Sequence, residues 1–228
     1  MRRAKLPPHL EFFGSLVYAC TDLDVLKEYI LHMDQSLHEA EAACATSAQA
    51  IPPSLEIVAT DKSDLLADPF PRLLHAGFII SVVIFLEQQL TLFSQSLQRA
   101  EDLGLTIKDL SGSLIERFRK YCERVAHLPF SVSNENWEDL RGVLEIRNCL
   151  VHNNGLFEGF GKANTVEAFA KRHGTPIIED GMLSVNTGTS LKVLDVVKVF
   201  VEAIHDAALG KYPEEKQASS SGMNSTPD

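Results

Sequence analysis

The sequence predicts an all-α protein, a helical bundle with one small β-hairpin before its last helix. Three observations predict this class. Long segments, above all 70–100 and 190–209, repeat apolar residues at helical spacing. Prolines and glycines lie between these segments and seldom inside them. The clearest strand signal is the stretch 177–185, in which two β-prone runs flank Asp180-Gly181, a pair typical of a type I′ turn.

The bounds of the individual elements follow from the spacing of apolar residues and from the positions of helix-breaking prolines and glycines. Residues 10–45 are expected to be helical, with Thr21-Asp22 as an N-cap if this helix is divided in two. Residues 46–71 contain Pro52-Pro53 and read as a connecting segment with room for a short helix around 63–66. The next helix, 70–100, is apolar almost all round in its first half and should end at Gly104. Further helices are expected at 111–126, 137–152, 165–172 and 190–209, and the stretch Ser133-Asn134-Glu135-Asn136 is expected to cap the second of these.

We divide the chain into three parts. Residues 1–69 hold the N-terminal helices and the connecting segment, and residues 70–210 form a helical domain. Residues 211–228 are polar and rich in serine, so we expect a disordered tail. Two roles stay open for the first part: it completes the bundle, or it forms a separate helix pair that binds a partner.

Composition narrows the class of protein. A formal net charge of −10 argues against a surface that binds nucleic acid broadly, although a small basic cleft is compatible with it. The four cysteines form no CxxC pair, which favours a reducing cytoplasm. The longest apolar run, 76–86, falls short of the roughly 20 residues that span a bilayer, so we expect a buried helix and no membrane partner. No apolar stretch follows the basic first residues, so a signal peptide is not expected.

The stretch 146–155 combines three residues suited to phosphate chemistry. Arg147, Asn148 and His152 lie near the end of an apolar helix, which Asn153-Asn154-Gly155 should terminate. At about 100° per residue, Arg147 falls inside the apolar arc of that helix. A guanidinium there needs a cleft or an acidic partner, and Glu87 is the candidate acid.

Helical geometry separates the arginine from the histidine. Asn148 and His152 are four residues apart and share a polar flank with Arg141 and Glu145. Arg147 and His152 are five apart, so a straight helix directs them about 140° away from each other. A shared site therefore needs a second copy of the chain across a two-fold axis, or a distorted helix end.

These residue types match metal-independent cleavage of RNA. A histidine can take the proton from a ribose 2′-OH, an arginine can hold the phosphate, and an asparagine can orient either of them. The simpler interpretation is that both side chains bind carbonyls at the helix C-terminus. The cluster Arg117, Arg119, Lys120 and Arg124 likewise reads as a solvated face or as a wall that binds phosphate.

The segment Arg147-Asn148-Cys149-Leu150-Val151-His152 resembles the R-x4-6-H motif of the HEPN superfamily (higher eukaryote and prokaryote nucleotide-binding domains). Its setting is similar too, because a long apolar helix ending in Phe85-Leu86-Glu87 precedes it, and a hairpin and a final helix follow. The resemblance covers roughly 70–209 and implies an all-α bundle that dimerises through the motif helices.

The resemblance also implies an activity. Many HEPN proteins are endoribonucleases of toxin–antitoxin or defence systems, which leave a 2′,3′-cyclic phosphate. Carried over, Arg147 binds phosphate, His152 is the general base or acid, Asn148 supports both, and the partners are RNA, a second copy and an antitoxin or regulatory protein. Other members are non-catalytic modules that bind a protein or a nucleotide, and this alternative stays open. No metal or cofactor motif is present, since the sequence lacks HExxH, GxGxxG and Walker A patterns.

Overall fold

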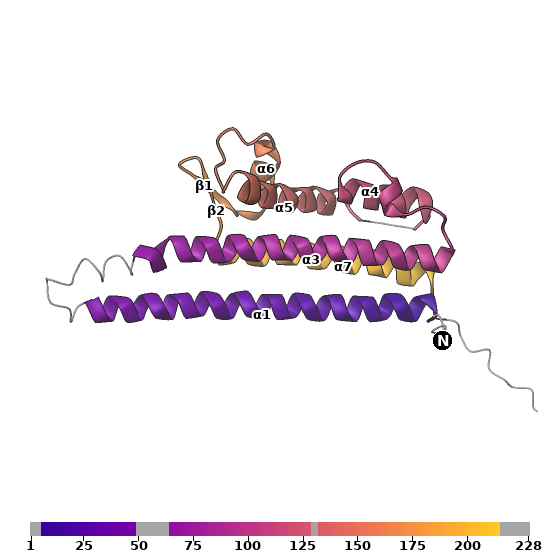
Figure 1. Cartoon of the computed structure of the whole chain (residues 1–228), viewed down its shortest axis with the longest axis horizontal. Coiled ribbons are helices and arrows are strands. Elements are labelled where there is room, and N and C mark those ends of the chain that lie inside the picture. The colour runs from indigo at the N-terminus through magenta and orange to yellow at the C-terminus, as the bar shows by residue number, and fades with distance from the viewer. Residues whose placement is uncertain (1–5, 49–63, 129–131, 215–228) are drawn as a thin grey trace, which may run out of the picture.

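The computed structural model describes residues 6–48, 64–128 and 132–214. They form an all-α bundle with one two-stranded hairpin before the last helix, which confirms the predicted class. Figure 1 shows three long helices side by side, α1, α3 and α7, with α4 and α5 on the far side of α3 from α1. The tail was predicted over 211–228, and disorder was wrong for its first two residues, because Lys211 belongs to the last helix and the Tyr212 ring stacks on Phe12. Residues 215–228 and most of the connecting segment, 49–63, lie outside the described residues.

Helix α1 spans Pro8–Ala48 without a break. Division at Thr21 was therefore wrong, because the Thr21 hydroxyl donates to the Val17 carbonyl inside the helix and caps nothing. The buried residues Phe12, Ala19, Leu23 and Ile30 recur at spacings of seven and four, which keeps one face of α1 on the bundle. They belong to the same hydrophobic core as residues of α3, α5 and α7, so α1 packs as part of one bundle.

Helix α3 spans Pro69–Glu101, and residues 64–67 before it are also helical. Its end lies within one residue of the predicted end at 100, but Asp102 rather than Gly104 terminates it: Asp102 adopts the left-handed conformation at φ 51° and its N–H donates to the Gln98 carbonyl. The helix is less buried than predicted. One stripe of it faces solvent, with Leu73 62% exposed and Ile84 53% exposed.

By length and composition, the helical stretch Asp64–Glu101 could also cross a membrane, and 33% of its most apolar window is buried in the bundle. Within the described ranges it is the one helix that passes this test. A core helix of a soluble protein passes it as well, so the test does not decide where the protein acts.

Polar contacts fix the register of the three long helices. Helix α7 spans Thr187–Lys211 and begins with the Asn186 side chain accepting from the Thr189 N–H. The Asp34 carboxylate of α1 accepts a 2.7 Å hydrogen bond from Thr187 and lies 3.3 Å from Nε2 of His75 on α3. The other ring nitrogen of His75 lies 3.1 Å from the Ser190 hydroxyl of α7. One carboxylate and one imidazole therefore join all three helices.

The segment after α3 is shorter and less regular than the predicted helix 111–126. A 3₁₀ turn spans Ile107–Asp109, and α4 spans Leu114–Lys120 with a capping box between Ser113 and Glu116. A π-helical turn, Tyr121–Val125, then continues it and buries Tyr121 and Cys122 in the core.

The remaining elements surround the predicted motif. Helix α5 spans Asn134–His152 and α6 spans Ala163–His173. Strands β1, Ile177–Glu179, and β2, Met182–Ser184, pair antiparallel. Asp180 and Gly181 between them have φ angles of 50° and 74°, as the predicted type I′ turn requires.

Helices α5 and α6 approach closely at Gly142. A Cβ built on this residue would lie 2.5 Å from the Phe169 ring, which is fully buried. The glycine therefore sets the distance between the motif helix and α6.

We expect Gly142→Ala to lower the free energy of unfolding by about 1–3 kcal/mol, because the ring and the backbone must move apart. The matched control is Gly14→Ala in α1, where a new Cβ meets nothing within 4 Å. That change should be neutral or stabilise by about 0.5–1 kcal/mol through helix propensity. Urea unfolding of both variants measures the difference, and equal effects would contradict the role assigned to Gly142.

Buried histidines should make the fold sensitive to mild acid. Burial lowers the pKa of His75 despite the nearby Asp34, and burial also lowers the pKa of His205 despite its contact with the Val201 carbonyl. The unfolded chain then binds protons at a higher pH than the folded chain does. The free energy of unfolding that the neutral histidines contribute is fully present above the ordinary histidine pKa near 6.5, and it falls as the pH drops below that value. We expect a lower urea midpoint at pH 5.5 than at pH 7.5, and a smaller difference in His75→Gln.

Candidate functional site

Both ends of the motif helix are held in place. At its start the Ser133 side chain accepts from the Asn136 N–H, as the sequence predicted. At its end the Gly155 N–H bonds the Cys149 carbonyl, with Gly155 at φ 79°. The hairpin also binds the segment that follows α5, because the Leu183 N–H donates to the Gly155 carbonyl and the Phe157 N–H donates to the Gly181 carbonyl. The hairpin therefore fixes the direction in which the chain leaves His152.

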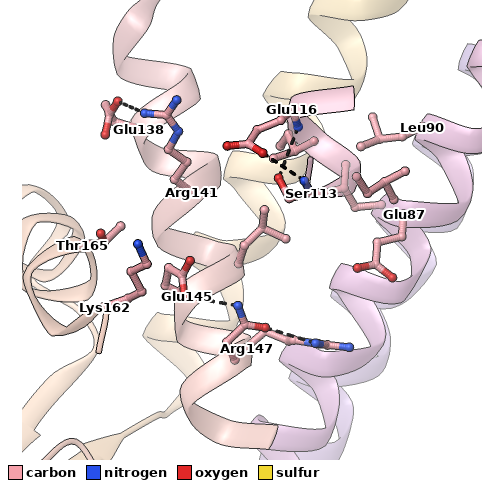
Figure 2. Close-up of a pocket in the computed structure, with 15 residues that line it drawn as sticks. Glu87, Leu90, Ser113, Glu116, Glu138, Arg141, Glu145, Arg147, Lys162 and Thr165 are labelled. Atoms are coloured by element: carbon pink, nitrogen blue, oxygen red, sulfur yellow. Dashed lines mark hydrogen bonds and ion pairs between the residues drawn. The ribbon is translucent and has the colours of Figure 1, made fainter. Parts of the chain in front are cut away.

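Arg147 is half-buried between α5 and α3. Its guanidinium donates a 3.2 Å hydrogen bond to Oδ1 of Asn148, and its Nε is buried without a partner. Figure 2 shows the side chain directed toward α3, on the side where Glu87 lies. No ion pair joins Arg147 to Glu87 in the described part of the chain. The predicted direct pairing was wrong, although both residues line one cavity.

Asn148 links the arginine to an acid on the same helix. Its amide oxygen accepts from Arg147, and its amide nitrogen donates a 3.2 Å hydrogen bond to Glu145. This chain satisfies Asn148 and turns its oxygen toward the guanidinium. The asparagine therefore orients Arg147 in this structure, and within the described ranges no hydrogen bond joins its side chain to His152.

His152 is the last residue of α5, and its side chain is exposed. Its imidazole makes no hydrogen bond or ion pair with any residue in the ranges that the structure describes. It is also absent from the lining of the cavity beside Arg147. A structural role as a carbonyl cap is not seen, and the ring is free to meet another molecule.

The cavity beside Arg147 measures about 510 Å³ and lies between α3, α4, α5 and the start of α6. Figure 2 shows its charged lining, in which acids and bases alternate. The acids are Glu87, Glu116, Glu138 and Glu145, and the bases are Arg141, Arg147 and Lys162. A single copy of the chain therefore does not present a positive groove.

Several of these charges already have partners. Arg141 pairs with Glu138 at 2.7 Å, and Glu116 accepts from the Ser113 N–H in the capping box. That hydrogen bond lowers the pKa of Glu116. The cationic groups left for a ligand are Arg147 and Lys162, the residue that precedes α6.

Helix α6 is anchored to the motif helix by a charged cluster. Arg172 donates to Oδ1 of Asp139 through Nε at 2.8 Å and through a terminal nitrogen at 2.6 Å. Nε2 of His173 lies 2.9 Å from the same oxygen, off the direction of a hydrogen bond. Burial raises the pKa of Asp139, but the neighbouring His173 and Arg172 more than offset this and lower it. This cluster positions the wall of the cavity that carries Lys162.

The basic cluster after α3 serves mainly local structure. Arg119 pairs with Glu123 at 2.8 Å and its guanidinium lies 5.1 Å from the centre of the Trp137 ring. Lys120 donates to the Ser111 carbonyl. Arg117 has a buried Nε without a partner. None of these bases lines the cavity, so a phosphate-binding wall at this cluster receives no support.

The cysteine nearest the site is buried, and so is Cys122. Cys149 and Cys122 are buried, and burial raises the pKa of both thiols, which keeps them protonated and unreactive. Among residues 6–48, 64–128 and 132–214, no group of three or more His, Cys, Asp or Glu side chains is arranged to hold a metal ion.

Three comparisons with known proteins found no match to this chain. No family model matches the chain, and no curated protein or solved structure is significantly similar to it. The HEPN resemblance therefore remains a prediction from the motif and its helical setting.

Lys162, Ser113 and Thr165 line the cavity but were not singled out from the sequence. Lys162 stands in a glycine-containing loop, where a single lysine gives no pattern. Ser113 and Thr165 belong to helix starts, which sequence patterns detect as caps rather than as cavity walls. Only the packing of α4 and α6 against α5 brings them to Arg147.

Proposed function

We propose that this protein is a metal-independent endoribonuclease of the HEPN type, whose active site is completed by a second copy of the chain. One observation carries the proposal: on an uninterrupted helix, Arg147 opens into a cavity while His152 stands exposed and unengaged at the helix end. Neither residue has the role that a purely structural helix end would give it.

The reaction uses the two residues as phosphate holder and proton carrier. His152 takes the proton from the ribose 2′-OH, and the 2′-oxygen attacks the adjacent phosphorus. Arg147 holds the phosphate and stabilises the charge that develops on its oxygens. The bond to the 5′-oxygen breaks, and that oxygen takes a proton from water or from the second His152. The products are a 2′,3′-cyclic phosphate and a free 5′-hydroxyl.

Asn148 has a defined place in this scheme. It accepts from the Arg147 guanidinium and is itself held by Glu145. It therefore limits the rotation of the arginine and leaves the remaining guanidinium donors for phosphate.

A second candidate is a non-catalytic helical module that binds a protein partner or a nucleotide. The four carboxylates that line the cavity favour a protein partner, because they oppose the approach of RNA phosphates, and equally of a nucleotide, to a single copy. On this alternative the Arg147–Asn148–Glu145 chain is a structural network, and His152 has no chemical role.

Cleavage of RNA in the presence of EDTA separates the two functions. We expect the wild type to cut single-stranded RNA with EDTA present, and Arg147→Ala and His152→Ala each to lose at least about 100-fold in rate, since each removes a transition-state contact. Mass spectrometry of the fragments should show 2′,3′-cyclic phosphate ends.

The matched control is Arg141→Ala, which removes an arginine from the same helix and the same cavity but one that is paired with Glu138. It should keep most of the activity. An inactive wild type, or equal rates in all four proteins, would leave the non-catalytic module as the better account.

A further inference from the structure

In the described part of the chain, one of the four carboxylates that line the cavity beside Arg147 has no partner. Glu116 accepts from a backbone N–H, Glu138 pairs with an arginine, and Glu145 accepts from an amide. The fourth is Glu87 of α3, which is half-buried. Its carboxylate forms no hydrogen bond or ion pair within residues 6–48, 64–128 and 132–214. The α3 wall of the cavity therefore offers an open acceptor.

The bases of the cavity leave Glu87 unneutralised. The Arg147 guanidinium donates to Asn148, and Lys162 stands before α6, on another wall. Figure 2 shows Glu87 on the α3 side and Lys162 on the α6 side. No ion pair joins Lys162 to Glu87 among the described residues. Strong acceptors and strong donors thus face the same space from different elements.

This mixed lining suits a neutral ligand that carries both donors and acceptors. Four acids stand against three bases, so the formal charge of the lining is close to zero. An added cation would meet the three bases, and an added anion would meet the four acids. A neutral ligand avoids both repulsions, and its hydrogen bonds to charged groups are stronger than those between neutral groups.

Apolar side chains and the size of the cavity suit a flat ring. Leucine and isoleucine side chains from three helices contribute to the lining: Leu86 and Leu90 of α3, Leu114 and Ile115 of α4, and Leu144 of α5. The cavity of about 510 Å³ lies within the range of about 300–1,000 Å³ that is usual for small-molecule sites. Bases that leave a stack commonly pack on apolar side chains in such pockets. A nucleobase therefore matches the cavity in size and in polarity.

Among the four RNA bases, guanine matches a free carboxylate best. Its N1–H and its N2 amino group lie next to each other on one edge, so they can donate in parallel to the two oxygens of Glu87. Adenine and cytosine carry an amino group beside an acceptor nitrogen, and uracil carries N3–H between two carbonyl oxygens. Each of these edges sets an acceptor against the carboxylate. Guanine also offers the acceptors O6 and N7, which lysine and arginine commonly bind, and Lys162 is available for them.

We propose that the cavity holds a guanine base of the RNA and that Glu87 selects this base by accepting from its N1–H and its N2 amino group. Bases of single-stranded RNA can leave the stack and be read on this edge. A base is neutral, so the carboxylates that repel phosphate do not repel it. The inference rests on the proposed function, because the phosphate next to this guanosine is the one that Arg147 holds. It deepens that function by naming the base at the cut.

Titration of the full chain with nucleosides tests the pocket apart from catalysis, because nucleosides carry no phosphate. We expect guanosine to bind with a dissociation constant of about 1 mM or tighter, and inosine, adenosine and cytidine to bind at least about tenfold more weakly. Inosine is the sharpest comparison, since it differs from guanosine only in lacking the N2 amino group. Chemical shift changes in NMR spectra measure the four affinities.

Glu87→Gln should weaken guanosine binding at least about tenfold, because the amide replaces one of the two acceptors with a donor. The matched control is Glu138→Gln, the same change in the same cavity at an exposed residue that is paired with Arg141. It should bind guanosine as the wild type does. Urea midpoints of both variants should lie close to that of the wild type, since neither carboxylate is fully buried.

The outcomes separate the pocket from the ribonuclease. Guanosine that does not bind, or nucleosides that bind equally well, would overturn the inference. An equal loss of guanosine affinity in Glu87→Gln and Glu138→Gln would overturn it too. Selective binding of guanosine by a protein that cuts no RNA keeps the pocket and rejects the ribonuclease. RNA cleavage with no preference for guanosine at the cut does the reverse.

Discussion

The uninterrupted course of α5 is the constraint on which the rest of this account depends. Arg147 and His152 are five positions apart, and the helix remains regular up to His152. Their side chains therefore point about 140° apart. The arginine enters a cavity next to α3, and the histidine stays at the surface. No rearrangement of rotamers on one chain removes this divergence, so joint chemistry requires groups from another chain.

The surrounding fold holds α5 in this position. Phe169 lies against Gly142, the Asp139 cluster ties α6 to the helix, and the hairpin bonds the residues that follow its end. These contacts hold α5 near Asp139, near Gly142 and just beyond its end at Gly155. The same packing brings Lys162 to the cavity. The proposed active site is thus a consequence of how α3, α4 and α6 pack around α5.

Much of the fold was predictable because its signals are local. Helical periodicity located α3, α5 and α7, and Asp180-Gly181 identified the hairpin with the correct turn. The start of α5 followed from Ser133. The errors arose where tertiary packing overrides local signals. Thr21 looks like a cap but lies inside α1, whose buried face continues past it. The 111–126 segment changes to a π-helical turn that buries Tyr121.

The candidate site was predictable only in part. The divergence of Arg147 and His152, and the common flank of Asn148 and Glu145, follow from helix geometry alone. The cavity also needs walls from α4 and from the start of α6, and sequence patterns do not reveal how these elements pack beside α3 and α5. Glu87 lines the same cavity as Arg147, but the guanidinium donates to Asn148 and forms no ion pair with Glu87 in the described part of the chain.

Mixing two inactive variants tests the central claim, that Arg147 and His152 act together across two chains. Arg147→Ala and His152→Ala are each expected to be inactive in RNA cleavage. After the two are unfolded together and refolded at equal amounts, half of the dimers contain one chain of each kind, and each such dimer has one intact composite site. The mixture should therefore recover about a quarter of the wild-type rate. A mixture no more active than either variant alone, beside an active wild type, would contradict a site shared between two chains.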